Sequence, residues 1–391
     1  MNDLYLDIGY NSINHDGEQL CGDHVDVITT NDDNNTVIVL ADGLGSGVKA
    51  SILSTLTAKI ISTMLAEGLS ITECVNTIVQ TLPICKIRGV AYSTFTIMRV
   101  TNHNEVELIQ FDNPKALYFK KGINTEYPIK ETIVDGKKIL YSKIIASCDD
   151  AFIAMSDGCP HAGIGLSYNF GWSIKDITKF LESLYDTRLT AKTLSTLFIE
   201  EVNRQYGFHP GDDATCCILM LKKRNPVNII FGPARNLEDD ERMLDLFFSY
   251  KGKHIVAGGT TSTIVARYLK KDILVDFNYL VKDIPPIAKI DGVDLVTEGI
   301  ITINRVLEYA LDYLDKNARH DEWLKGLDGA SQICRILFTE ATDINFIVGR
   351  AVNPAHQNPD LPISFNIKMN LVDNLSSCLK KMGKRVNTTF F

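Results

Sequence analysis

Two kinds of apolar pattern alternate along the first 222 residues. Short runs rich in β-branched residues end at turn residues and predict strands, whereas Val48, Ile52 and Leu56 recur at helical spacing and predict a long helix. The predicted strands are Leu4–Ile13, Val25–Thr29, Thr36–Leu40, Tyr92–Val100, Val106–Phe111, Ala116–Lys120, Lys138–Ile145, Ala151–Met155 and Ala214–Leu221. The predicted helices are Ser46–Ala66, Ile71–Thr81, Ile174–Tyr185 and Ala191–Tyr206. This order predicts an α+β fold, a β-sandwich flanked by helices on its outer faces in an α-β-β-α arrangement.

The pattern changes after the polar segment Lys222–Pro226, where strands and helices begin to alternate more regularly. The predicted strands are Val227–Phe231, His254–Ala257, Ile273–Asp276, Val293–Val296 and Ile344–Val348. The predicted helices are Glu238–Phe248, Ser262–Leu269, Ile303–Leu314 and Ser331–Phe338. We therefore expect a first domain at residues 1–223 and a smaller three-layer α/β domain at residues 226–391.

Composition excludes several classes of protein. The 391 residues are 45% apolar and 23% charged, which is ordinary for a globular chain long enough to form two cores. A net charge of −8 without any basic stripe argues against a nucleic-acid or membrane surface. The N-terminus lacks a signal-peptide pattern, and no apolar run reaches the roughly 20 residues that span a bilayer. The nine cysteines form no paired C-x-x-C spacing, so we expect reduced thiols in a cytoplasmic protein rather than zinc ligands.

Four short motifs each place an aspartate beside a glycine where a predicted strand begins or ends. They are Cys21-Gly22-Asp23, Ala41-Asp42-Gly43-Leu44-Gly45-Ser46-Gly47, Ser156-Asp157-Gly158 and Gly211-Asp212-Asp213-Ala214-Thr215. A hairpin turn or a helix cap explains any one of them, because Asp-Gly is a common turn pair. Four of them together supply carboxylates from distant segments, which is what a hard divalent cation needs.

The order and wording of these motifs resemble the metal-dependent protein phosphatases of type 2C (the PPM family), specifically their bacterial SpoIIE-type branch. The resemblance covers about residues 1–222. It implies hydrolysis of phosphoserine or phosphothreonine on a protein in bacterial signalling. It also implies a hydroxide that bridges two Mn²⁺ or Mg²⁺ ions and attacks phosphorus.

The resemblance also implies a role for each motif. Asp42 would bridge both ions, and the carbonyl of Gly43 would be a ligand of one of them. Asp157 and Asp212 would complete the second metal site. Asp23 would hold the first ion directly or through water.

Neighbouring residues are assigned weaker roles. We expect Asp213 to support the site rather than ligate a metal, and Thr215 to hydrogen-bond the loop that holds Asp212. His24 is either a proton donor to the leaving alcohol or a solvent-facing strand residue. His161 either faces the cleft or is an ordinary loop residue.

The choice of substrate rests on fewer signals. No arginine precedes Arg88, so phosphate recognition is left to the metal ions, an absence that the SpoIIE-type branch tolerates. The segment Cys159–Trp172 is short, which predicts an open cleft suited to a folded phosphoprotein. The alternatives are a hydrolase of a small phosphorylated metabolite and a regulatory pseudophosphatase that binds without turnover.

The second domain carries one candidate ligand loop. Gly258-Gly259-Thr260-Thr261 lies between a predicted strand and a predicted helix, so its free amides and its threonine hydroxyls suit a phosphate or a carboxylate. Thr297-Glu298-Gly299 is a second loop of the same kind, and the two would face one crevice. These loops suggest a small anionic effector that controls the phosphatase. A helix-capping turn, and a domain for homodimerisation or partner docking, are the alternatives.

Overall fold

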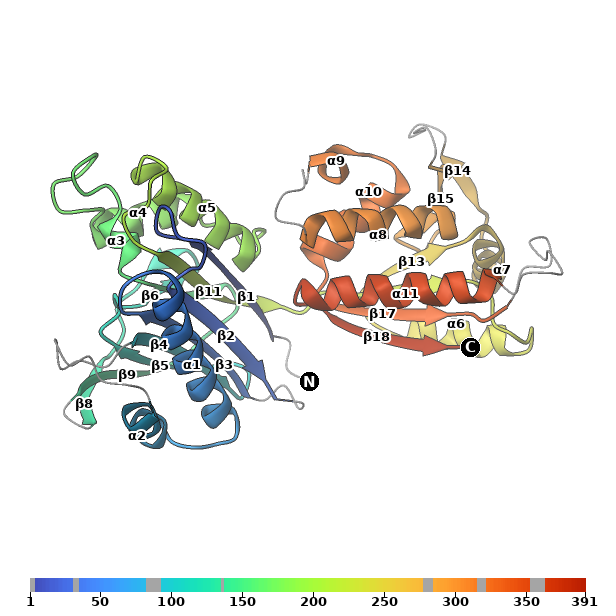
Figure 1. Ribbon diagram of the computed structural model, residues 1–391. Coiled ribbons are helices and arrows are strands. Elements are labelled where there is room, and N and C mark those ends of the chain that lie inside the picture. Colours follow the sequence, from blue (N-terminus) through green and yellow to red (C-terminus); the bar gives the residue numbers. More distant parts are fainter. Residues whose placement is uncertain are drawn as a thin grey trace. The chain divides into compact units, whose positions relative to one another are not determined.

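A computed structural model of the chain describes residues 4–30, 35–81, 93–134, 137–276, 284–314, 321–351 and 363–391. It divides into two compact units, Met1–Lys223 and Arg224–Phe391, which are described separately below (Figure 1). Tyr92, the first residue of one predicted strand, lies outside the described residues.

The first unit contains two antiparallel sheets. One has the strand order β1-β11-β10-β6-β7, and the other has the order β2-β3-β4-β5-β9-β8. The strands of the first sheet are β1 (Leu4–Ile13), β6 (Leu117–Lys120), β7 (Ile123–Asn124), β10 (Asp150–Met155) and β11 (Ala214–Lys223). Those of the second are β2 (Asp23–Thr29), β3 (Asn35–Gly43), β4 (Ser93–Thr101), β5 (Glu105–Phe111), β8 (Lys130–Val134) and β9 (Lys137–Ile145).

Alternation along the strands produces four layers. In β3, Ile38 and Leu40 point into the core between the sheets, whereas Val37 and Val39 point outward. Helices α1 (Gly47–Ala66) and α2 (Ile71–Thr81) cover that outer face, and α4 (Ile174–Leu184) and α5 (Ala191–Gln205) cover the outer face of the other sheet. The predicted α+β sandwich flanked by helices is therefore confirmed for this unit.

Helix α1 lies on β2 and β3 with an unexpected face (Figure 1). The apolar positions that predicted the helix are largely exposed: Val48 is 60% exposed and Ile52 is 53% exposed. Small residues such as Ala50 and Ala58 occupy the buried face instead, and they allow a close approach to the sheet. This is the one helix among the described residues that is long and apolar enough to cross a membrane.

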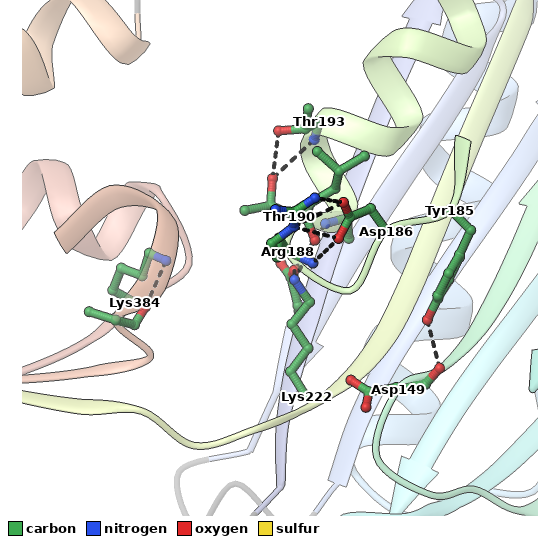
Figure 2. Close-up of polar contacts among 12 residues, drawn as sticks. Asp149, Tyr185, Asp186, Arg188, Thr190, Thr193, Lys222 and Lys384 are labelled. Carbon is green, nitrogen blue, oxygen red and sulfur yellow. Dashed lines mark hydrogen bonds and ion pairs between the residues drawn. The ribbon is translucent and has the colours of Figure 1, made fainter. Parts of the chain in front are cut away.

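The turn between α4 and α5 is held by polar contacts (Figure 2). Asp186 accepts a 2.6 Å hydrogen bond from Arg188, and this pairing lowers the pKa of Asp186 to about 2. Thr190 is the N-cap of α5, and the ammonium of Lys222 at the end of β11 donates to the carbonyl of Leu189. These contacts fix the start of α5 against the edge of its sheet.

The second unit is built on a 7-stranded sheet with the order β14-β15-β16-β13-β12-β17-β18. Its strands are β12 (Pro226–Phe231), β13 (Lys253–Ala257), β14 (Leu274–Asp276), β15 (Ile287–Lys289), β16 (Leu295–Thr297), β17 (Asp343–Val348) and β18 (Arg385–Phe390). Pairing is parallel from β16 to β18 and antiparallel at β14 and β15. The carboxyl ends of the parallel strands therefore meet at one edge of the sheet.

Helices cover both faces of this sheet and make three layers. Helices α6 (Asp239–Ser249) and α7 (Gly259–Leu269) pack on one face around Ile230 and Val256. On the other face, the core around Ile229 is covered by α8 (Ile300–Leu314), α9 (Asp321–Lys325), α10 (Gly329–Cys334), a π-helical segment η1 (Arg335–Glu340) and α11 (Ile363–Lys381). The sequence pattern missed α9, α11, β15 and β18, and it predicted α10 and η1 as one helix.

Candidate active site

The fold brings all four aspartate motifs to one end of the sandwich. Asp23 begins β2 and lies directly opposite Asp42 near the end of β3. Asp157 follows β10 and is the N-cap of the short helix α3 (Gly158–His161), whereas Asp212 lies just before β11. The charges of Asp23, Asp157 and Asp212 all act on Asp42.

Strand alternation decides where these side chains point. Asp42 is in phase with Ile38 and Leu40, which face the space between the sheets, and its cross-strand partner Asp23 is only 6% exposed. The acids from one sheet therefore meet those from the other in the space between the two sheets. The segments that carry these acids are far apart in the sequence, so the contacts between them depend on the fold.

Ser156 ties the two halves of the site together, a role that the sequence pattern did not reveal. Its hydroxyl donates a 2.7 Å hydrogen bond to Asp23 Oδ2 and accepts a 2.9 Å bond from the amide of Thr215. We had expected the hydroxyl of Thr215 to bond the loop that holds Asp212. It donates to Ser12 Oγ at 2.8 Å instead. The only sequence signal for this bridge is the position of Ser156 immediately before an Asp-Gly pair.

Asp213 is enclosed by two of the motif glycines. It is 3% exposed, and its Oδ1 accepts a 3.0 Å hydrogen bond from the amide of His15. A Cβ atom on Gly22 would lie 2.7 Å from Asp213 Oδ2, and one on Gly158 would lie 2.1 Å from the Asp213 carbonyl oxygen. Larger residues at these two positions would push the site segments apart, which explains the glycines beside Asp23 and Asp157.

The acids strongly perturb one another. Burial, followed by the charges of the other three aspartates, raises the pKa of Asp42 to about 9. Burial also raises the pKa of Asp23 to about 7, although the Ser156 hydrogen bond opposes the rise. The pKa of Asp212 is raised by burial and by the charge of Asp157. A cluster of this kind is destabilised whenever its carboxylates are ionised without a cation.

Two oxygens in the cluster have no hydrogen-bond partner. Asp23 Oδ1 and Asp213 Oδ2 are both buried and unpaired. A buried carboxylate oxygen without a donor is costly unless a cation neutralises it. The residues of the cluster bring several anionic oxygens together. They therefore fit hard divalent cations such as Mg²⁺ or Mn²⁺.

Gly43 continues the backbone from Asp42 towards α1. Its amide donates to the carbonyl of Gly22 at 3.2 Å, and a Cβ here would lie 2.2 Å from the carbonyl oxygen of Ala50. The first turn of α1 is therefore packed directly on the Asp42 turn. The role of the Gly43 carbonyl as a metal ligand stays a prediction.

The two candidate histidines have different placements. His24 shares a face of β2 with Asp26, which pairs with Lys59 of α1 at 3.3 Å, and the charges acting on His24 are those of Asp26 and Lys59. It therefore points away from Asp23, and its placement gives no support to a role as proton donor. His161, in contrast, lies with Asp157 and Asp212.

The candidate ligand loop of the second unit is only partly free. The Thr261 hydroxyl accepts a 3.0 Å hydrogen bond from the amide of Gly232, and the amide of Gly258 donates to the carbonyl of Thr297 at 2.9 Å. Gly259 and Thr260 instead begin helix α7, with no atom within 4 Å of a Cβ placed on Gly259. The Gly258 amide thus already has a partner, whereas the Thr261 hydroxyl accepts one bond and keeps its own proton to donate, so an anion site at this loop stays a prediction.

The second predicted loop is closed to anions. The carboxylate of Glu298 accepts hydrogen bonds from the amides of Ile301 at 3.0 Å and Thr302 at 3.4 Å, and so caps α8 itself. Of the two expected ligand loops, only the one at the start of α7 therefore remains a candidate. A buried ammonium, that of Lys368, lies near this edge, since a Cβ on Gly232 would lie 2.4 Å from its Nζ.

An α-β-β-α sandwich with clustered aspartates at one end is the arrangement that the motif resemblance implies for a protein phosphatase of type 2C. Residues 32–222, slightly under half of the chain, match the family described as Stage II sporulation protein E (SpoIIE). This match within the first unit supports a domain of the SpoIIE type, in agreement with the motif resemblance. No curated protein sequence matches the chain.

Several solved structures are similar to this chain. The PP2C phosphatase domain of SpoIIE from Bacillus subtilis, with a fragment of its regulatory domain, is 16% identical over 57% of this chain and 65% of that one, with a TM-score of 0.49. The RsbU and RsbW domains of a Mycobacterium tuberculosis protein are 14% identical over 56% and 62%, with a TM-score of 0.46. RsbX in complex with magnesium is 18% identical over 57% and 98%, with a TM-score of 0.39. This chain thus spans less than two thirds of the first and second of these structures.

Proposed function

We propose that the protein hydrolyses phosphoserine or phosphothreonine on a protein substrate in bacterial signalling, with two divalent ions held by the aspartate cluster. The observation that carries this proposal is the set of buried acids with unpaired oxygens, Asp23 Oδ1 and Asp213 Oδ2, around Asp42. Bound cations would offset the repulsion among these carboxylates and so stabilise the cluster.

Each residue has a distinct part in this arrangement. Asp42, which the other three acids surround, would contact both ions, with Asp157 and Asp212 on one side and Asp23 on the other. The Gly43 carbonyl would complete one ion's ligands. Two such ions neutralise phosphoryl oxygens and supply a bridging hydroxide at neutral pH. Ser156 holds Asp23 in one orientation through its 2.7 Å hydrogen bond.

The surroundings of the cluster favour a protein substrate over a small metabolite. The segment that follows α3 exposes apolar side chains: Leu166 is 67% exposed and Phe170 is 95% exposed. Leu166 lies near the Asp212 loop, since a Cβ on Gly207 would be 3.5 Å from it. Exposed apolar residues of this kind are a contact surface for another protein.

Phosphatase assays with and without Mn²⁺ test the proposal. We expect wild-type protein to release phosphate from a phosphoserine protein and from p-nitrophenyl phosphate only with Mn²⁺ or Mg²⁺, and Asp42→Asn to be inactive on both. A Phe170→Ser variant should raise KM for the phosphoprotein and leave p-nitrophenyl phosphate turnover unchanged. Binding of a phosphoprotein without any turnover would instead indicate a pseudophosphatase, and an unchanged KM in Phe170→Ser would favour a small metabolite.

We also propose that a small anionic effector binds the second unit at the start of α7. Lys368 supports this idea, because its buried ammonium contacts the carbonyls of Gly349 at 3.0 Å and Ala351 at 3.4 Å, but forms no ion pair with a described carboxylate. Burial lowers the pKa of this lysine, so an anion nearby would stabilise its charged form.

Calorimetric titration with inorganic phosphate, AMP and ATP tests the effector site. Binding that Lys368→Met abolishes would support it. If none of the three probes binds, the alternative of a homodimerisation or partner-docking unit takes its place, and sedimentation of the full chain then reports whether it is a dimer.

A further inference from the structure

His161 is a titratable group beside the aspartate cluster that the proposed arrangement does not use. It ends the single turn of α3, and its amide donates a 3.1 Å hydrogen bond to the carbonyl of Asp157. Residues four apart on a helical turn project from the same face, so the imidazole lies beside the Asp157 carboxylate. The ligand atoms of Asp157, His161 and Asp212 all lie within 4.8 Å of one another.

The distance between His161 and Asp212 does not correspond to a hydrogen bond. His161 Nδ1 lies 4.0 Å from Asp212 Oδ2, beyond the reach of a direct N–H···O bond. A second exposed pair in the same unit, His209 and Asp16, closes to 3.0 Å instead. The His161 imidazole therefore faces an aspartate without bonding it, although nothing in its exposed position prevents closer contact.

The separation matches two ligands of one ion. With bonds of about 2.1 Å to an octahedral ion, adjacent ligand atoms lie about 3 Å apart and opposite ones about 4.2 Å apart. The 4.0 Å between His161 Nδ1 and Asp212 Oδ2 is close to the separation of two opposite ligands. Neutral imidazole is the commonest side-chain metal ligand in proteins.

The position of α3 is fixed from several sides. A Cβ on Gly158 would lie 2.1 Å from the Asp213 carbonyl oxygen, and one on Gly171 would lie 2.2 Å from the Pro160 carbonyl oxygen. The hydroxyl of Tyr206 donates a 2.7 Å hydrogen bond to the carbonyl of Gly158. The helical turn is therefore held against the Asp212–Asp213 loop, which keeps His161 over Asp212 before any ion binds.

We infer that His161 is a nitrogen ligand of the metal ion shared by Asp157 and Asp212, and that it biases this site towards Mn²⁺ over Mg²⁺. The inference rests on the proposed two-metal function. Mg²⁺ takes oxygen ligands and retains water, whereas imidazole raises the affinity for first-row transition ions. Because the nitrogen ligand belongs to one ion only, the two metal positions differ in selectivity.

Metal binding by EPR tests this assignment without relying on activity. The full chain, wild type and His161→Ala, is titrated with Mn²⁺ while free Mn²⁺ is measured, and Mg²⁺ affinity is obtained by competition. We expect His161→Ala to weaken one Mn²⁺ site by at least about tenfold and to change Mg²⁺ affinity by less than about threefold. Pulsed EPR on bound Mn²⁺ should show a directly coordinated nitrogen in wild type that His161→Ala removes.

His103→Asn is the matched control. His103 lies in the β4–β5 turn at the far end of the second sheet: Thr94 of β4 pairs with Asp42, but Thr101 pairs with Asn35. Its φ of 66° is one that asparagine tolerates. This variant should leave both metal affinities and the nitrogen signal unchanged. Far-ultraviolet circular dichroism confirms that each variant is folded.

The outcomes separate this inference from the proposed function. Stoichiometric Mn²⁺ binding without a coordinated-nitrogen signal in wild type overturns the role of His161 but leaves the phosphatase proposal intact. An unchanged Mn²⁺ affinity in folded His161→Ala has the same meaning. If wild-type protein binds no Mn²⁺ or Mg²⁺ at all, the two-metal proposal itself fails.

Discussion

Replacing Asp42 by asparagine should stabilise the metal-free protein, although it abolishes phosphatase activity. The charges of Asp23, Asp157 and Asp212, together with burial, raise the pKa of Asp42 from its ordinary 3.8 to about 9. The ionised side chain is thus unfavourable in the folded state without a cation. Asparagine keeps the shape but removes one of the clustered charges.

The sign and size of the effect follow from proton linkage. A carboxyl whose pKa is raised on folding costs nothing below the unfolded value near 4, and its cost grows as the pH rises towards about 9. Each tenfold change in proton affinity corresponds to about 1.4 kcal/mol, or about 7 kcal/mol for the full rise. Because the penalty is shared among the clustered charges, we expect Asp42→Asn to recover roughly half, on the order of 3 kcal/mol at pH 8.

Urea unfolding of EDTA-treated protein measures this difference between pH 5 and 9. The chain has two tryptophans, of which Trp172 is buried in the first unit against Phe198. A Trp323→Phe background therefore makes fluorescence report the first unit alone. Asp26→Asn is the matched control, because Asp26 lies on β2, the strand next to that of Asp42, but pairs with Lys59 on the other face of the sheet.

The difference between Asp42→Asn and wild type should be small at pH 5 and increase with pH, whereas Asp26→Asn should show no stabilisation. Adding Mn²⁺ should reverse the order, since a cation stabilises only the protein that binds it. A metal-free Asp42→Asn protein that is no more stable than wild type at pH 8, or a difference independent of pH, would refute the reasoning.

The remaining predictions concern single parts of the molecule. Asp157→Asn and Asp212→Asn should each lower activity strongly, with partial recovery at high Mn²⁺ by mass action; a loss that no Mn²⁺ concentration relieves, with both ions bound, would contradict a ligand role. Ser156→Ala should weaken Mn²⁺ binding about 10- to 100-fold, because it frees Asp23, and unchanged calorimetric affinity would count against that bridge. A chain ending at Lys223 should fold and keep phosphatase activity, since the first unit has its own core, and an insoluble product would show that the units share one. Gly259→Val should leave basal activity unchanged and abolish any phosphate or ATP binding seen by calorimetry, whereas equal binding would exclude the start of α7.

Sequence patterns alone were sufficient for the sandwich and for its acidic motifs. Each motif is local, an aspartate and a glycine at the end of an apolar strand, so its identity needs no knowledge of the tertiary contacts. The gathering of Asp42 and Asp157 was inferred from resemblance, and in the structure the charge of Asp157 acts on Asp42 from the other sheet.

Tertiary structure decided which neighbours of those motifs take part. His24 adjoins Asp23 in sequence, yet strand alternation turns it towards α1, whereas a single helical turn carries His161 to Asp157 and Asp212. The sequence likewise did not predict that Val48 is exposed on α1, because the small residues of that helix pack on the sheet instead. Periodicity specifies that a side chain belongs to one face of its element, but only packing against distant segments decides whether that face meets a core, a site or solvent.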